Sequence, residues 1–249
     1  MIILDIDMDF FTDQPVSNEA NCNSQERLDD TYYGKHVWQE KRVRSFFENN
    51  LGLSASTKIL GRIVSNHDGA LYFWEELINQ EKLTVPFSVL HIDAHADLGF
   101  GCIGNQTIVD TILSYPREYR KTRFCDGIED DGRFLGINMC NYLLFALAFG
   151  WVSDLTYCTN TLLSSLDISK QFIDYSVKQR IDNGFETQIV LRKTDGSGRM
   201  VVPFRIIKQS RQFKCDREFD YVVLAQSPSF TPVSADYIMD VFRDYIIEI

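Results

Sequence analysis

Short apolar runs that alternate with longer amphipathic stretches place the strongest constraint on how this chain can fold. Runs rich in Val, Ile, Leu and Phe predict buried strands at 1–9, 59–64, 87–93, 155–158 and 221–225. Helices are predicted in the stretches between and after them, at 36–50, 69–79, 107–113, 137–150, 168–181 and 234–247. This alternation predicts an α/β protein with a three-layer α/β/α fold and a mainly parallel sheet.

The chain of 249 residues carries no internal repeat, low-complexity tract or domain linker, so a single domain over 1–249 is expected. Two β-rich runs at 187–193 and 200–208 flank a glycine-rich turn and predict a hairpin. Residues 12–31 are polar with little periodicity, which predicts a long loop or lid. Open parallel sheets bind ligands beyond the carboxyl ends of their strands, so a site is expected at that edge.

The formal net charge of −10 argues against a nucleic-acid partner, whose phosphates are bound by clustered Lys and Arg, and it suits a cationic substrate. No apolar run approaches the roughly 18 residues of a membrane span, so no membrane partner is expected. Asp5, Asp7 and Asp9 fall where a signal peptide has its apolar stretch, and the six cysteines form no CxxC pair. These features predict a cytoplasmic protein with reduced thiols, and they set no oligomeric state.

The first polar motif lies in the N-terminal strand, where Asp5, Asp7 and Asp9 alternate with apolar residues. Side chains alternate across a strand, so the three carboxylates are predicted to share one face. In a dry site they repel one another unless some are protonated or cations neutralise them. The alternative is an exposed edge strand with solvated aspartates, which the apolar flanks of the motif disfavour.

The second motif follows the strand at 87–93 and carries four potential metal ligands, His91, Asp93, His95 and Asp97. The strand is expected to end near Asp93, with the remaining residues in a loop. Carboxylate oxygens combined with imidazole nitrogens suit Mn, Fe or Zn better than Mg or Ca. Four potential ligands within seven residues disfavour the alternative, in which the histidines are satisfied within a core.

The third motif places His67 after the strand at 59–64 and immediately before a predicted helix. This is again the carboxyl end of a strand, so His67 is expected near the first two motifs. A single histidine in such a position is often structural, and only the shared placement favours a ligand. The metal ligands predicted from the three motifs are Asp5, Asp7, Asp9, His67, Asp93, His95 and Asp97.

These motifs resemble those of the arginase/agmatinase (ureohydrolase) family. Segment 93–97 (DAHAD) matches its DAHxD signature, 66–70 (NHDGA) resembles its Asp-His-Ser strand end, and 5–11 (DIDMDFF) resembles its SxDxD segment. The combination is most similar to a divergent arginase-like branch that includes peptide arginases, which convert arginine to ornithine within ribosomally made precursor peptides. The matching motifs cover about thirty residues, in which DAHxD is the specific part.

The resemblance implies a site for two Mn²⁺ ions, bridged by Asp93. It assigns His67 and Asp97 to one ion and His95 to the other. Other divalent cations remain compatible with the same donor types.

Two aspartates of the first strand supply the remaining ligands in this resemblance. The favoured alignment selects Asp7 and Asp9 and puts Asp5 where the family has a serine, one step deeper. A slip of one step selects Asp5 and Asp7 instead. In ordinary arginases the DxD strand follows DAHxD in the chain, so here that strand is expected to be permuted to the N-terminus.

The same resemblance directs the search for proton-transfer groups. Asp97 is expected to accept a hydrogen bond from the attacking water and to pass its proton to the leaving amine. The family's shuttle histidine is absent from 104–107. His91 is therefore expected either to orient a ligand or to transfer protons, and His36 is the remaining candidate shuttle, although it also fits a surface helix.

Three residues are candidates for binding substrate. Asn105 lies in the loop after DAHxD, where the family contacts the backbone groups of its substrate, and Asn141 opens a predicted helix. An Asn in either place also fits an ordinary turn or cap. The family's guanidinium-binding glutamate has no match in 224–228, where Gln226 is the available side chain.

The expected function is hydrolysis of a guanidinium group, with an arginine-containing peptide or a small guanidino compound as substrate and urea as product. One alternative is another metallohydrolase of C–N bonds, such as a deacetylase-type amidohydrolase that uses one metal-bound water. A second is a non-catalytic, metal-stabilised peptide-binding protein. A phosphatase of the haloacid dehalogenase type, with Asp5 or Asp7 as nucleophile and Mg²⁺ as cofactor, leaves the motif at 91–97 unexplained.

Overall fold

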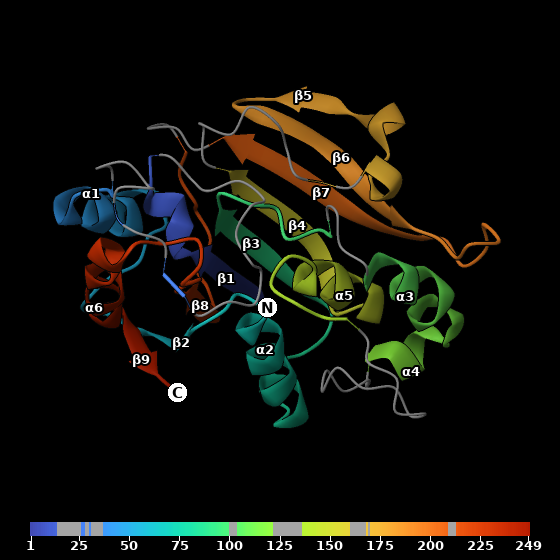
Figure 1. Ribbon diagram of the computed structural model, residues 1–249, viewed down its shortest axis with the longest axis horizontal. Coiled ribbons are helices and arrows are strands. Elements are labelled where there is room, and N and C mark those ends of the chain that lie inside the picture. The colour runs from blue at the N-terminus through green and yellow to red at the C-terminus, as the bar shows by residue number, and fades with distance from the viewer. Residues whose placement is uncertain are drawn as a thin grey trace.

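A nine-stranded sheet forms the centre of the computed structural model (Figure 1), which describes residues 1–13, 26–27, 30, 37–99, 104–121, 136–159, 168, 170–208 and 213–249. The order of the strands is β5-β6-β7-β4-β3-β1-β8-β2-β9. The strands are β1 (Ile2–Asp7), β2 (Ile59–Val64), β3 (Phe87–Asp93), β4 (Val152–Thr159), β5 (Gln179–Ile181), β6 (Gly184–Leu191), β7 (Met200–Lys208), β8 (Tyr221–Ala225) and β9 (Ile246–Glu248).

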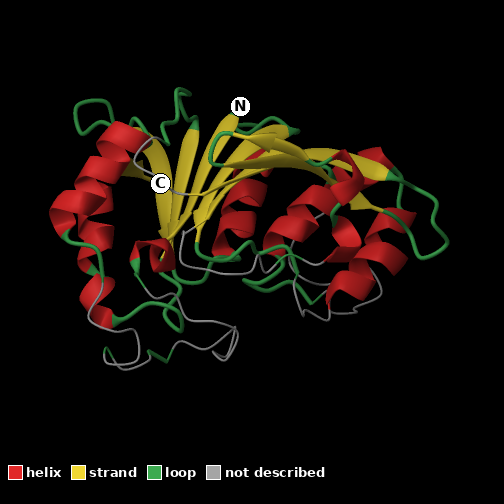
Figure 2. Cartoon of the chain, turned by 90° about the horizontal axis from the view of Figure 1, so that it is seen from above, coloured by secondary structure: helices red, strands yellow, loops and turns green. Residues whose placement is uncertain are grey.

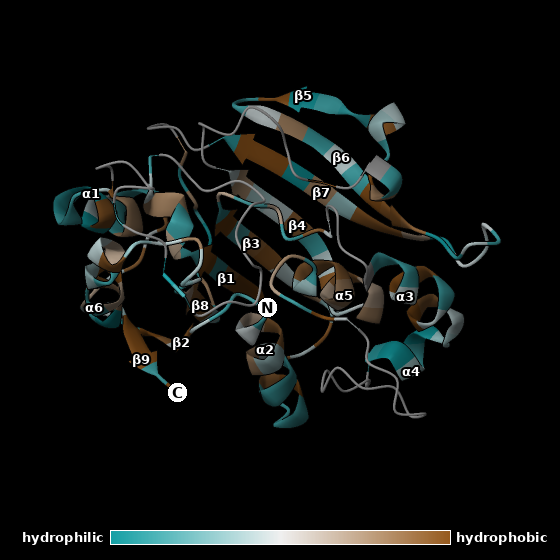
Figure 3. Ribbon diagram, viewed as in Figure 1, coloured by the Kyte–Doolittle hydropathy of each residue, from teal (hydrophilic) through white to brown (hydrophobic). Residues whose placement is uncertain are grey.

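The sheet is parallel except at one edge, where β6 runs antiparallel to both β5 and β7. Strand β1 lies between β3 and β8 and pairs with both in parallel, with Asp5 opposite His91 on one side and Asp7 opposite Ala225 on the other. The prediction of an α/β protein with a mainly parallel sheet is confirmed, as is the hairpin, which is β6 and β7. The centre of the sheet is hydrophobic, whereas the edge strand β5 is largely hydrophilic (Figure 3).

Helices cover both faces of the sheet (Figure 2). One apolar cluster joins odd-numbered residues of β1 and β3 to α2, α3 and α5, and a second joins even-numbered residues of the same strands to α1 and α6. This separation follows from the alternation of side chains along a strand. The helices are α1 (Glu40–Ser45), α2 (Gly69–Asn79), α3 (Gly104–Asp110), α4 (Arg117–Lys121), α5 (Tyr142–Phe149) and α6 (Tyr237–Arg243). No helix among the described residues has the length and apolar character needed to cross a membrane.

Several predicted elements have the bounds that the sequence indicated, namely β2, β3, β8 and α2. The predicted helix at 168–181 is wrong, because its described residues contain two short 3-10 turns, η4 (Lys170–Phe172) and η5 (Tyr175–Val177), followed by β5. The predicted helix at 234–247 ends at Arg243, and the chain then forms β9. Sheet pairing overrides helical periodicity there, since Ile246 lies opposite Ile59 of β2.

The first strand is also shorter than predicted. It ends at Asp7, and a 3-10 turn, η1 (Met8–Phe11), follows it, so Asp9 leaves the strand. Two residues of this turn, Phe10 and Phe11, pack against Trp38 with ring centroids 5.4–5.7 Å apart. Phe11 also packs edge-to-face against Phe47, at 5.6 Å. The aromatic packing therefore fixes the turn that carries Asp9.

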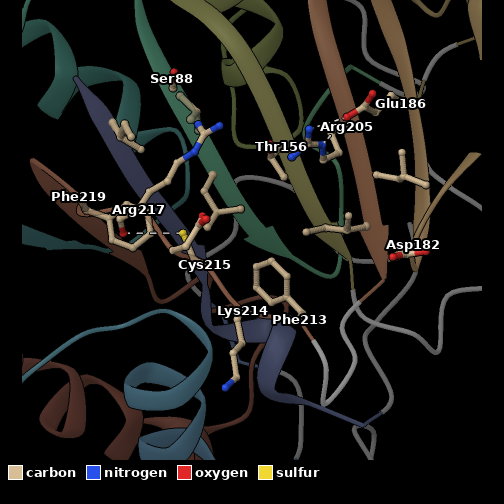
Figure 4. A pocket seen from close by; sticks show the side chains of 16 residues that line it. Ser88, Thr156, Asp182, Glu186, Arg205, Phe213, Lys214, Cys215, Arg217 and Phe219 are labelled. Carbon is tan, nitrogen blue, oxygen red and sulfur yellow. Dashed lines mark hydrogen bonds and ion pairs between the residues drawn. The ribbon is translucent and has the colours of Figure 1, made fainter. Parts of the chain in front are cut away.

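A groove of about 380 Å³ lies on the sheet face that carries α1 and α6 (Figure 4). Ser88, Thr156 and Arg205 form part of its floor, and the segment at 213–219 forms one wall. None of the aspartates and histidines of the three motifs lines this groove, so it is separate from the site that they predict.

Replacing Phe47 by Ala is expected to lower the free energy of unfolding by about 3–5 kcal/mol, because a fully buried ring leaves a cavity. Phe47 also contacts the rings of Phe242 and Tyr245. Urea denaturation of both proteins measures the difference. Val233→Ala, at a residue that is 60% exposed, is the control and is expected to change stability by less than about 0.5 kcal/mol. An equal effect of the two substitutions would contradict the assigned packing.

Candidate metal centre

The three polar motifs meet at the carboxyl edge of the sheet. Strands β1 and β3 lie side by side there, and His67 follows β2, two positions further along the sheet order. Parallel strands end at the same edge, so ligands from distant parts of the chain converge. The eight side chains of the motifs are buried or nearly so: Asp5, Asp7, Asp9, His67, His91, Asp93, His95 and Asp97.

One group of side chains surrounds His67. Its Nδ1 atom lies 3.1 Å from an oxygen of Asp7 and 3.0 Å from oxygens of Asp93 and Asp97. A ring nitrogen carries at most one proton and can satisfy only one of three acceptors. Nδ1 of His67 and Oδ2 of Asp93 are in fact buried without a hydrogen bond. One nitrogen and three carboxylate oxygens around a shared space fit a divalent cation with mixed N/O ligands.

A second group consists of Asp9, Asp93 and His95. Nδ1 of His95 lies 2.7 Å from Oδ2 of Asp9 and 3.9 Å from Oδ1 of Asp93. The backbone N–H of Ala94 donates to the other oxygen of Asp9 at 3.3 Å and orients it. These three side chains offer ligand atoms within 4.8 Å of one another, as do Asp7, His67 and Asp93. Asp93 belongs to both groups and therefore lies where two neighbouring ions would share a ligand.

Two residues of the site have left-handed backbone conformations, which are unusual for residues other than glycine. Asp97 has φ = 49° and Ser227, just after β8, has φ = 47°. Asp97 thereby reaches His67, and the Ser227 hydroxyl donates a short hydrogen bond to Asp7. Such conformations cost about 1–3 kcal/mol and cluster at functional sites. Ser227 was not predicted as a site residue, because a serine after a strand carries no distinctive sequence signal.

Burial and mutual repulsion control the charge of the site. Burial, together with the charges of Asp9, Asp97 and Asp7, raises the pKa of Asp93 well above its ordinary value. Burial and the Asp9 charge likewise raise the pKa of Asp7. Burial alone would lower the pKa of His67, but the Asp5 carboxylate and its hydrogen bond raise it well above the ordinary range. Without cations, the site therefore retains protons that its ligand atoms must lose to bind metal.

Asp5 lies deeper than the other carboxylates. Its Oδ1 accepts from Nε2 of His67 at 3.2 Å, and its Oδ2 accepts from Nδ1 of His91 at 3.1 Å and from the Tyr142 hydroxyl at 2.6 Å. Burial opposes its ionisation, but the two histidines hold the pKa of Asp5 below its ordinary value. Sequence reasoning missed Tyr142. The available signal was a tyrosine opening an otherwise apolar helix, since a buried phenol requires a hydrogen-bond partner.

The other predicted site residues make different contacts. The amide nitrogen of Asn105 donates to the carbonyl of Gly99 at 2.7 Å. Asn141 accepts from the backbone N–H of Asn138 and donates to a backbone carbonyl, which fixes the turn before α5. Gln226 donates to Asp236 at 3.0 Å. These three amide side chains thus hydrogen-bond to other groups of the protein and do not join the carboxylates of the three motifs.

His36, the candidate proton shuttle, lies outside the described residues. Solvent reaches the cluster on the side of His95 and Asp97, whose side chains are 14% and 10% exposed. The ring of Phe230 packs against His95 at 5.2 Å and borders this opening. Buried Asp and His groups at this edge could hold metal ions, as the sequence predicted. No protein-family model matches the chain, and no curated protein matches it.

Mn²⁺ binding is expected to weaken as the pH falls, because the pKa values of Asp93 and His67 are raised and both must lose a proton to act as ligands. As the pH falls below the raised pKa of each group, the apparent dissociation constant should rise about tenfold per pH unit for each proton displaced. Proton retention by these groups also stabilises the metal-free fold at low pH, and that contribution is lost as the pH rises through the raised pKa values. The increase in Tm caused by Mn²⁺ should therefore be larger at the higher pH.

Isothermal titration calorimetry in two buffers of different ionisation enthalpy measures both the affinity and the protons released. A dissociation constant that is unchanged as the pH falls, with no proton release, would contradict the predicted exchange of protons for cations.

Proposed function

We propose that this protein is a metallohydrolase that uses two Mn²⁺ ions to hydrolyse a guanidinium group, the arginine side chain of a peptide, to ornithine and urea. The observation that carries the proposal is the position of Nδ1 of His67, which has no hydrogen bond and lies among three carboxylate oxygens, together with Asp93, which also faces a second ligand group. The resemblance of segment 93–97 to the DAHxD signature supports guanidinium chemistry.

The proposed ligands fall into two sets that share Asp93. Asp7, His67, Asp93 and Asp97 would hold one ion, and Asp9, Asp93 and His95 the other. Four carboxylates then balance the four positive charges of two divalent cations. Mixed carboxylate and imidazole donors agree with Mn²⁺, and they do not exclude Fe²⁺ or Zn²⁺.

When bound, the two ions would lower the pKa of a shared water toward neutrality and supply the nucleophile. Asp97 is the residue that we assign to proton transfer. It borders the solvent-exposed side of the cluster, so its carboxylate can meet both water and the leaving amine of the substrate. Its strained backbone conformation holds it there.

A carboxylate that binds a guanidinium of the protein itself is linked to this centre through the segment after β8. Asp236 accepts a hydrogen bond from Arg27 at 2.6 Å and one from Gln226 at 3.0 Å. Gln226 directly precedes Ser227, whose hydroxyl contacts Asp7. We assign the guanidinium-binding role to Asp236, with Gln226 orienting it, because Asp236 supplies the acidic group that 224–228 lacks. The net charge of −10 also favours a cationic substrate.

The test combines metal analysis with product analysis. Purified protein loaded with Mn²⁺ is expected to retain two ions per chain and to release urea from an arginine-containing peptide, which loses CH₂N₂ in mass spectrometry. Asp93→Ala is expected to lose both ions and all activity, because this residue is shared. Asp240→Ala, at an exposed residue paired with Arg243, is the control and should change neither.

Other outcomes separate the alternatives. Retention of two ions by Asp93→Ala would contradict the bridging role. Binding of metal and peptide without urea release would indicate a binding protein, and one ion per chain with hydrolysis of an acetylated peptide would indicate an amidohydrolase.

Asp236→Asn is expected to raise KM for the arginine peptide at least about tenfold, because a charged hydrogen bond to the guanidinium is lost. Its metal content should stay at the wild-type value, since Asp236 lies outside both ligand sets. Asp244→Asn, which removes an exposed partner of Arg44, serves as the matched control. An unchanged KM would remove Asp236 from substrate binding without affecting the assignment of the metal ligands.

A further inference from the structure

We infer that Asp5 is a positioning residue that, together with Tyr142, sets the ligand geometry of His67 without itself holding an ion. The inference rests on the proposed metal centre and adds to it a layer of side chains beneath the ligands. It concerns the residue that the sequence alone left open between ligand and supporting group.

Both carboxylate oxygens of Asp5 are engaged by donors from three separate parts of the chain. Oδ1 accepts from His67, which follows β2, and Oδ2 accepts from His91 of β3 and from Tyr142 of α5. A carboxylate offers about four lone-pair directions, and three of them are used here. Asp5 and Tyr142 are both 0% exposed, so no water competes for these bonds.

The contact with Asp5 determines which nitrogen of His67 is available. A proton on Nε2 donates to Asp5, so the proton that His67 must lose to bind a metal ion is the one on Nδ1, which faces Asp7, Asp93 and Asp97. Hydrogen bonding of the far ring nitrogen to a carboxylate is the usual way in which proteins orient a metal-binding histidine. Asp5 therefore explains both the orientation of His67 and the position of its Nδ1 among the three carboxylates.

Packing of neighbouring rings against His67 also supports this orientation. His67 stacks on His91 with centroids 5.2 Å apart at 29°, and its ring lies 4.9 Å from that of Tyr142. The ring of Tyr157 covers His91 at 5.5 Å, and its hydroxyl donates to the backbone carbonyl of Ala94. His67 thus packs against two rings while Asp5 accepts a hydrogen bond from its Nε2.

The composition of helix α5 does not otherwise explain a polar side chain at Tyr142. Its sequence is YLLFALAF, and every residue of it is buried. The phenol of Tyr142 is the one polar side-chain group in the helix, and it points to Asp5. A phenylalanine would satisfy packing alone, so the hydroxyl indicates that α5 contributes to the centre.

The test compares Mn²⁺ binding by wild-type protein, Asp5→Asn and Tyr142→Phe, using calorimetry and elemental analysis. An asparagine has one acceptor oxygen, so its amide protons would face at least one of the three donors. Asp5→Asn is expected to bind two ions about 10–100-fold more weakly. Tyr142→Phe is expected to show a smaller loss in the same direction, with the stoichiometry unchanged.

Tyr245→Phe is the matched control, because Tyr245 is 1% exposed and its hydroxyl donates to Glu48 outside the site. It is expected to lower Tm without changing Mn²⁺ affinity, which separates positioning from a general loss of stability. The electron paramagnetic resonance signal of a coupled Mn²⁺ pair should persist in Tyr142→Phe, since no ligand is removed.

Three results would overturn the inference. Wild-type affinity in Asp5→Asn would show that the residue does not position His67, and loss of one ion per chain would make it a ligand. If Asp5→Asn fails to fold, wild-type affinity in Tyr142→Phe would overturn it equally. Absence of Mn²⁺ binding by the wild-type protein would instead refute the proposed function, so the two failures are distinguishable.

Discussion

Repulsion between carboxylates that are excluded from water is the constraint on which the rest of this structure depends. Two like charges about 4 Å apart repel by about 4 kcal/mol at an effective dielectric constant of about 20. Asp7, Asp9, Asp93 and Asp97 form several such pairs, and a whole domain is stable by only about 5–15 kcal/mol. Positive charge must therefore enter the site, either as protons, which the raised pKa values of Asp7 and Asp93 describe, or as cations.

The fold opposes this repulsion by placing the interior of the sheet beneath the site. β1 lies in the interior of the sheet and pairs on both sides, and apolar clusters cover both of its faces. The aromatic packing of Phe10 and Phe11 fixes the turn that carries Asp9. Asp97 and Ser227 hold strained backbone conformations against this support, which is where strain can persist. The side chains of the candidate metal centre are therefore positioned by the fold itself.

The sequence predicted those parts of the fold and site that depend on periodicity and on strand ends. It located β2, β3, β8 and α2 because their apolar patterns are strong, and it brought the three motifs to one edge because parallel strands share an edge. It failed at 168–181 and at β9, where pairing with a neighbouring strand decides the structure and leaves no local pattern. The contacts of Tyr142 with Asp5 and of Asp236 with Arg27 join residues far apart in the chain, so no spacing rule could have found them.

The position of the aspartate-rich strand shows which property of the sheet brings the polar motifs together. In the family that the motifs resemble, this strand follows DAHxD in the chain, whereas here it comes first. The sheet order nevertheless places β1 directly beside β3, with Asp5 opposite His91. Hydrogen bonding between neighbouring strands, and not the connection between them, sets the spacing of Asp7 and Asp93. A group of side chains built on adjacent strand ends is therefore independent of the order in which the strands occur along the chain.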